Sequence, residues 1–389
     1  VGDYTATIDW GDGRATPGVV AYDSANNDFV VWASTDHVYT TASSYQITVT
    51  IDDAGGASIV AQSTAVIQQA ELEPDPLAPG QMMLAIGGTT GNDQIVLAAG
   101  PSPGSEAVTL NGVPLGTFAP TSRTLIFGQA GGDHFQVDAP LAAPVSIDAN
   151  TGVNSLYVAG AEDPTLAPVY NTIDSGTNLL TVVGDGANDS FTLANNAVTV
   201  ASPLNGNQPV PITLTKVQAT TIHGGAGDDS FTIAGANLPD TLLGDTGNDL
   251  FTFLDGSSLT GTIVGGTGGG TNTLDWSQYT TPRDITLTTI GMPGYDGTEA
   301  SLGGGFQNIN AVIGSGAGGN TLTGSNVANL WSVGGINSGS LNGRFGFSSI
   351  QNLVGQSVSD VFAFTGAADL TGAVTGGSGD ETLDYSGYS

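Results

Sequence analysis

The chain has 389 residues, which leaves room for two or three domains. Five Lys and Arg residues stand against 36 Asp and Glu residues, so the formal net charge is −31. Few cationic side chains are available to meet a phosphate or a uronate, which argues against nucleic acid, anionic lipid head groups and acidic polysaccharides as partners. The absence of cysteine excludes disulfides, thiolate zinc sites and a cysteine nucleophile.

The composition predicts an all-β fold with many turns. Of the 36 acidic residues 30 are Asp, a turn and cap residue, and Gly occurs 59 times. Hydrophobic residues make up 39% of the chain, enough to form a core. No apolar run approaches the length of a membrane span, so we expect no membrane insertion. No signal peptide opens the chain, and both ends lie inside patterned segments. We therefore expect a piece of a longer secreted polypeptide.

The first seventy residues carry a β-strand pattern with a recognisable order of motifs. Strands are expected over 4–10, 29–34 and 45–53, with a tight turn at the GDG of 11–13. The order WGDG, then H-x-Y at 37–39, then YQITVTIDD resembles the polycystic-kidney-disease-type (PKD) module. The resemblance implies a truncated immunoglobulin-like β-sandwich over 1–70 that serves as an extracellular spacer or binding module. Asp12 and His37 are expected to be turn and corner residues.

A linker and a repeat region follow this module. Residues 71–80 (ELEPDPLAPG) combine three prolines with three acidic residues and predict a stiff linker. Beyond residue 81, a Gly-rich turn, an Asp or Asn, and a strand of β-branched or aromatic residues recur in this order. The copies begin at residues 88, 128, 184, 224, 244, 265, 314, 355 and 376. Most steps between them are one or two multiples of about 20 residues, whereas the steps of about 56 and 49 require loop insertions.

This period predicts that 81–389 form a long right-handed parallel β-solenoid (β-helix), with possible sub-repeats 81–264 and 265–389. One turn of such a coil, here called a rung, is too small to bury its own apolar face, so stacked rungs share one core. At about 20 residues per rung we expect about 15 rungs, repeating every ~4.8 Å. Apolar residues that alternate with Thr or Ala after each turn, such as Phe231 and Ile233, are expected to point inward.

A longer repeat overlays the short one. The segment TLDWSQY at 273–279 returns as TLDYSGY at 382–388, and FQNINAVIGS at 306–315 is similar to FSSIQNLVGQ at 347–356. These segments resemble the tandem repeats of very large bacterial surface proteins, including haemagglutinin-like adhesins. The resemblance implies an architecture more than it implies an activity.

The acidic turns are candidate calcium sites. The segment GGAGDDSFT at 224–232 matches the repeats-in-toxin nonapeptide G-G-x-G-x-D-x-U-x, and that resemblance implies Ca²⁺ held by Asp side chains and turn carbonyls. The family stacks its nonapeptides nine residues apart, whereas this chain has one turn in 20 residues or more. The alternative is that each Asp or Asn caps its turn through backbone N–H groups without metal. The candidate ligands are Asp93, Asp133, Asp189, Asp228, Asp229, Asp245, Asp249 and Asp380.

Catalytic patterns are not found in the sequence. None of the three histidines stands in a metal-binding spacing, and no G-x-S-x-G motif occurs. We therefore expect no enzyme, and rank a carbohydrate-active β-helix enzyme last. The favoured function is an extracellular structural or adhesive segment of a large bacterial cell-surface protein, an acidic rod with calcium as its cofactor. The alternative is a self-assembling surface-layer (S-layer) or filament subunit. Expected partners are further copies of itself, or a surface glycan or protein.

Overall fold

The structure is a computed structural model. It describes residues 3–23, 28–33, 37, 39, 43–138, 141, 143–149, 152–159, 169–171, 177–184, 186–195, 197–201, 210–215, 217–266, 268–291 and 293–389. The described residues contain β-strands, turns and loops but no helix, which confirms the all-β prediction. Accordingly, this part of the chain offers no apolar helix of membrane-spanning length.

The N-terminal sheet has five antiparallel strands in the order β3-β2-β1-β4-β5. Its strands are β1 (Tyr4–Asp9), β2 (Ala15–Asp23), β3 (Asp28–Ala33), β4 (Ser43–Asp53) and β5 (Ser58–Ile67). The described residues of this region form one sheet, not the two packed sheets expected of a sandwich. Ala6 and Ile8 are buried beside Gly18, where an added Cβ would meet Val31, Ala6 and Ile8. The sequence analysis missed β2, because Pro17 and Gly18 interrupt its strand pattern.

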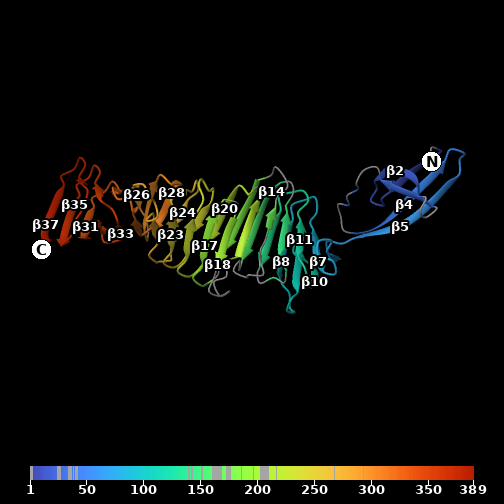
Figure 1. Cartoon of the computed structure of the whole chain (residues 1–389), viewed down its shortest axis with the longest axis horizontal. Helices are drawn as coiled ribbons and strands as arrows, with labels where there is room; N and C mark the ends of the chain where they lie inside the picture. Colours follow the sequence, from blue (N-terminus) through green and yellow to red (C-terminus); the bar gives the residue numbers. More distant parts are fainter. Residues whose placement is uncertain are drawn as a thin grey trace.

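The rest of the chain, from Ala70 to the C-terminus, forms an elongated two-sheet body (Figure 1). Its first sheet has the order β10-β9-β8-β12-β14-β16-β20-β22-β24-β28-β27-β26-β30-β34-β36. These strands are β8 (Gln94–Ala99), β9 (Glu106–Leu110), β10 (Val113–Phe118), β12 (His134–Asp138), β14 (Val153–Ala159), β16 (Thr177–Val183), β20 (Ala219–His223), β22 (Thr241–Leu243), β24 (Ile263–Val264), β26 (Asp284–Ile290), β27 (Tyr295–Glu299), β28 (Leu302–Ile309), β30 (Thr321–Thr323), β34 (Asn352–Val354) and β36 (Val374–Thr375).

The second sheet of the body pairs its strands in the order β6-β7-β11-β13-β15-β19-β18-β17-β21-β23-β25-β29-β33-β32-β31-β35-β37. These strands are β6 (Ala70–Pro74), β7 (Met82–Gly87), β11 (Thr124–Phe127), β13 (Val145–Asp148), β15 (Val169–Asn171), β17 (Ser190–Ala194), β18 (Ala197–Ala201), β19 (Val210–Thr215), β21 (Ser230–Ile233), β23 (Leu250–Phe253), β25 (Thr273–Asp275), β29 (Ala311–Ile313), β31 (Leu330–Gly335), β32 (Ser338–Leu341), β33 (Phe345–Ser348), β35 (Val361–Gly366) and β37 (Thr382–Tyr388).

One continuous cluster of buried apolar side chains fills the space between the two sheets, from Ala70 to Ala368. The parallel registers place like residues above one another, so that Phe191 pairs with Phe231 and Phe231 with Phe251. Strand alternation points these phenylalanines inward and leaves the intervening Thr residues outside the core. The stacked core thus follows directly from the repeated residues.

The regular 20-residue rung holds only around residues 219–264. The prediction of two rungs in each 40-residue step is wrong, because β7 pairs with β11 and β16 pairs with β20 at offsets of 40. At other long steps the chain inserts a three-strand antiparallel meander into one sheet. The meanders are β17–β19, β26–β28 and β31–β33.

The expected linker at 71–80 is in part a strand of the body. β6 pairs antiparallel with β7, and Leu72 packs against the core. Asp75 follows β6 and is buried, where Nε of Arg123 lies 3.0 Å from its Oδ2 and Nη2 lies 3.0 Å from its Oδ1. This ion pair fastens the turn after β6 to the start of β11, so the segment is held by apolar and ionic contacts that prolines and acids in the sequence do not indicate.

Candidate functional site

The turns of the body share one pattern, in which a Gly is followed five residues later by an Asp, Asn or Glu. An added Cβ would lie 2.1 Å from Oδ2 of Asp249 at Gly244 and 2.5 Å from Oδ2 of Asp133 at Gly128. Gly therefore leaves the space into which the acidic side chain folds. The further pairs are Gly88 with Asp93, Gly184 with Asp189, Gly224 with Asp229, Gly324 with Asn329, Gly355 with Asp360 and Gly376 with Glu381.

These buried side chains form ladders from rung to rung. The backbone N–H of Asp189 donates to Oδ1 of Asp229 (2.7 Å), and that of Asp229 donates to Oδ1 of Asp249 (3.1 Å). The backbone N–H of Asp249 in turn donates to Oδ1 of Asn272 (3.0 Å), and that of Asn272 to Oδ1 of Asn310 (3.0 Å). Each side chain therefore satisfies a backbone donor of the preceding rung, at a corner where the strands no longer do so.

A second ladder follows the other connections between the sheets, those that enter the first sheet from the second. There the N–H of Asp93 donates to Oδ1 of Asp133 (3.0 Å), and that of Asp133 donates to Oδ1 of Asn154 (2.8 Å). Asp93 and Asp133 are followed by strands of the first sheet, whereas Asp189, Asp229 and Asp249 are followed by strands of the second. The expectation of a single line of aspartates is therefore wrong, because the 56-residue step from 128 to 184 moves the turn from one edge to the other.

The remaining three predicted ligands lie outside the buried ladders. Asp228 is exposed, and its Oδ1 accepts from the backbone N–H and the side-chain amide of Asn248 (both 2.8 Å). Asp245, at a φ of 63°, lies 3.0 Å from Nδ1 of His223. Asp380 is exposed, and its backbone N–H donates to Oγ of Ser359 (3.0 Å).

The sequence analysis missed part of this arrangement. Asn154, Asn310 and Asn329 are ladder members that were not named as candidate ligands. The usable signal is the five-residue spacing from Gly to a polar residue, which also selects Asn329 and Glu381. The spacing is independent of the nonapeptide pattern that drew attention to 224–232.

Burial changes the acidity of the ladder carboxyls. Desolvation raises the pKa of Asp133 to about 6 and that of Asp249 to about 6, against the opposing effect of the backbone N–H each accepts. Desolvation likewise raises the pKa of Asp360. At the surface, hydrogen bonds from Asn248 lower the pKa of Asp228. The buried members thus approach neutrality under mildly acidic conditions, and the surface members stay charged.

The ladder oxygens are only partly used. Oδ2 of Asp133, Asp249 and Asp360 is buried without a hydrogen-bond partner. Within the described ranges, no group of three or more His, Cys, Asp or Glu side chains is arranged as a metal site. One carboxylate oxygen in each of these residues accepts a backbone N–H. This use matches the capping alternative, with the difference that the N–H belongs to the neighbouring rung.

The motif residues of the N-terminal sheet also come together. The rings of Trp10 and His37 stack at 4.5 Å, and the Tyr39 hydroxyl donates to the Trp10 carbonyl at 3.0 Å. Nε2 of His37 lies 3.1 Å from Oδ2 of Asp12. Tyr39 stacks on Tyr45 at 4.4 Å. The WGDG, H-x-Y and following tyrosine therefore build one aromatic corner, as turn and corner residues.

Comparisons with protein-family models, with curated proteins and with solved structures find no match to this chain. The resemblances to the PKD module and to the repeats-in-toxin nonapeptide therefore stay predictions, and the function has to be argued from the geometry.

Proposed function

We propose that this chain is a mechanical or adhesive segment of a bacterial extracellular surface protein, in which the body acts as an acidic β-solenoid rod that carries an immunoglobulin-like module. The observation that carries the proposal is the single core that runs between two sheets along the whole body (Figure 1). Rung-to-rung hydrogen bonds in the strands are supplemented by buried side-chain ladders at the corners. Repeated contacts of this kind favour stiffness and length over a catalytic cleft.

The charge distribution supports a hydrated exterior. The core contains aromatic and aliphatic side chains, while a net charge of −31 is spread over turns and outward strand faces. Like charges at this density keep rods apart and soluble. The role we propose is to project or space a binding end from the cell surface.

Electron microscopy and single-molecule stretching test this role together. Isolated chains should appear as straight rods with one smaller module at one end, and stretching should release the body in steps at a high force. Flexible beads or a globular particle would refute the proposal. Turnover on a panel of neutral glycans would move the protein into the carbohydrate-active class instead.

The alternative of a self-assembling surface-layer or filament subunit is favoured by one observation on the N-terminal sheet. Apolar side chains are exposed on it, including Trp32 at 49% and Ile59 at 66%. An extended sheet with such residues can pair with a neighbouring chain. Ordered lattices or fibres at rising protein concentration would support this alternative over an isolated rod.

Calcium belongs to the proposal as a stabiliser of the acidic edge, with Asp228, Asp229, Asp245 and Asp249 as the ligands of highest priority. Carboxylates repeated along one edge repel one another, and a divalent cation relieves that repulsion. A chelator titration followed by the melting temperature tests this part. A melting temperature that excess chelator leaves unchanged would reject structural calcium and leave the rod proposal intact.

A further inference from the structure

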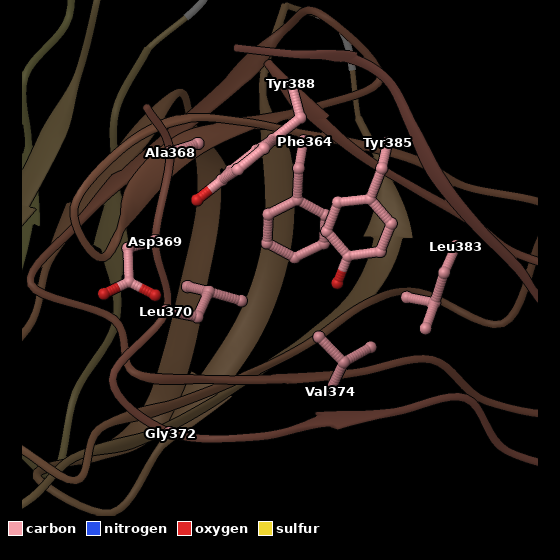
Figure 2. A pocket seen from close by; sticks show the side chains of 9 residues that line it. All are labelled: Phe364, Ala368, Asp369, Leu370, Gly372, Val374, Leu383, Tyr385 and Tyr388. Carbon is pink, nitrogen blue, oxygen red and sulfur yellow. The ribbon is translucent and has the colours of Figure 1, made fainter. Parts of the chain in front are cut away.

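The C-terminal end of the body exposes a rung whose interior equivalent is buried. Leu383, Tyr385 and Tyr388 are exposed by 56%, 54% and 53%. Together with Phe364 and Leu370 they line a hollow of about 430 Å³, which Figure 2 shows open at the end of the ladders. Among the described strands, only β35 is in register with β37. The end of the body is therefore an apolar surface beside a free strand edge.

The repeat at 273–279 has the same local structure as this end. The backbone N–H of Ser277 donates to Oδ1 of Asp275 at 2.7 Å, and that of Ser386 donates to Oδ1 of Asp384 at 2.8 Å. The equivalent aromatic stacks are Phe253 with Trp276 at 5.3 Å, and Phe364 with Tyr385 at 4.9 Å. In the interior copy, however, Leu274, Trp276 and Tyr279 are exposed by only 0%, 0% and 6%.

The cover of the interior copy is one further rung, formed by residues 302–313. β28 adds in parallel to β24, with Ile263 opposite Phe306, and β29 adds in parallel to β25, with Leu274 opposite Val312. The backbone N–H of Trp276 donates to the carbonyl of Ile313 at 2.9 Å. The two copies therefore differ in what lies on top of them and not in how they fold.

We propose that the C-terminal end face is a docking surface for one further rung of the same repeat, a polypeptide with the strand pattern of residues 302–313 that adds in parallel to β36 and β37. A Phe306 equivalent would cover Val374, and a Val312 equivalent would cover Leu383. This inference rests on the internal repeat and does not require the proposed mechanical role.

The opposite end of the body cannot supply that rung. β6 covers β7 there, and the β9–β10 hairpin covers β8, all in antiparallel pairs. β6 also brings Glu71 and Glu73 to that end. The N-terminal end of a second copy therefore presents capped strands and acidic side chains, which do not complement the apolar C-terminal face.

The experiment appends a copy of residues 281–314 after Ser389 of the full chain and measures backbone hydrogen exchange over 382–388. The expected result is exchange slowed at least about tenfold, because β37 gains a parallel partner and its side chains become buried. The matched control carries Phe306→Asp and Val312→Asp in the appended copy only. Equal exchange with the intact and the control extension would overturn the proposal.

Two further measurements fix the occupant. Leu383→Asp in the extended chain should abolish the protection of 382–388 while leaving exchange in β21–β23 unchanged, since Leu383 is exposed in the unextended chain. Retained protection would show that the extension does not dock on this face. The unextended chain should sediment as a monomer at rising concentration, and a dimer that protects 382–388 would make a second copy the occupant and overturn the assignment.

Discussion

The pairing of a glycine with a buried polar side chain five residues later is the smallest repeated device in the body. It depends on the missing Cβ of the glycine and not only on backbone freedom, because Gly244 and Gly224 have no positive φ. The carboxyl group sits where a side chain of any other residue would stand. The Gly-rich turn in the sequence is therefore a packing requirement of the ladder.

Gly244→Ala tests that requirement. The new Cβ would lie 2.1 Å from Oδ2 of Asp249 and 2.7 Å from the carbonyl of Gly265, so we expect a loss of about 2–4 kcal/mol in the free energy of unfolding. Gly186→Ala is the matched control, because nothing lies within 4 Å of its added Cβ. Denaturant titration of both variants gives the comparison, and an equal, small effect would contradict the packing role.

Asp249→Asn tests the charge on the ladder. The pKa of Asp249 is raised from 3.8 to about 6 by burial, so the native state binds its proton more tightly than the unfolded chain does. The stability from this group is fully present below about pH 4 and is lost as the pH rises through about 6. Asn keeps the acceptor oxygen without the charge, as Asn272 and Asn320 do.

We therefore expect Asp249→Asn to raise the free energy of unfolding by about 1–2 kcal/mol at pH 7.5 and to leave it almost unchanged at pH 4. Denaturant titrations at the two pH values measure the difference. Destabilisation at pH 7.5 that calcium reverses in the parent chain alone would contradict this account and favour Asp249 as a metal ligand.

At the scale of the elements, the stack of phenylalanines holds neighbouring strands of the second sheet together. Phe231 lies between Phe191, at 4.9 Å, and Phe251, at 4.7 Å, with both pairs of rings tilted by 14°. All three side chains are fully buried. Offset stacking of this kind adds to the free energy gained from burial.

Phe231→Ala should cost about 3–5 kcal/mol of unfolding free energy, because it leaves a cavity with aromatic faces on both sides. Phe127→Ala is the control, since Phe127 is 43% exposed and should lose less than about 1 kcal/mol. Thermal unfolding of the two variants provides the measurement. Similar losses would mean that the stack does not support the core.

The elements also show what the sequence could and could not predict. The inward residues around Phe231 and Phe251 follow from strand alternation, and the all-β class follows from the Asp and Gly content. The meanders β17–β19, β26–β28 and β31–β33 could not be predicted, because an antiparallel insertion and a second rung have the same length and the same alternation. The edge on which a ladder lies depends on those insertions, so it could not be predicted either.

At the scale of the whole molecule, the parallel registers predict that entire rungs can be removed. Deletion of residues 224–243 joins His223 to Gly244 and keeps the turn at 244–249 intact. Phe251 would then pair with Phe191, and Asp249 would accept the N–H of Asp189, because both now pair with the deleted rung. We expect a folded, slightly shorter body with one cooperative transition.

Deletion of residues 234–243 is the control, since it removes half of a rung and shifts inward residues out of register. Circular dichroism and thermal unfolding compare the two deletions. Unfolding of the 20-residue deletion, or equal tolerance of both, would contradict a body built from interchangeable rungs.

The single core between the two sheets has a consequence for growth. In a compact globule the buried fraction rises with chain length and then reaches a limit at which the interior divides. In this body each added rung buries about as much apolar surface as the one before it, so stability per residue stays constant with length. Nothing in the contacts of an interior storey counts how many others exist. The total number is free to change through duplication or loss of gene segments, without redesign of any single turn.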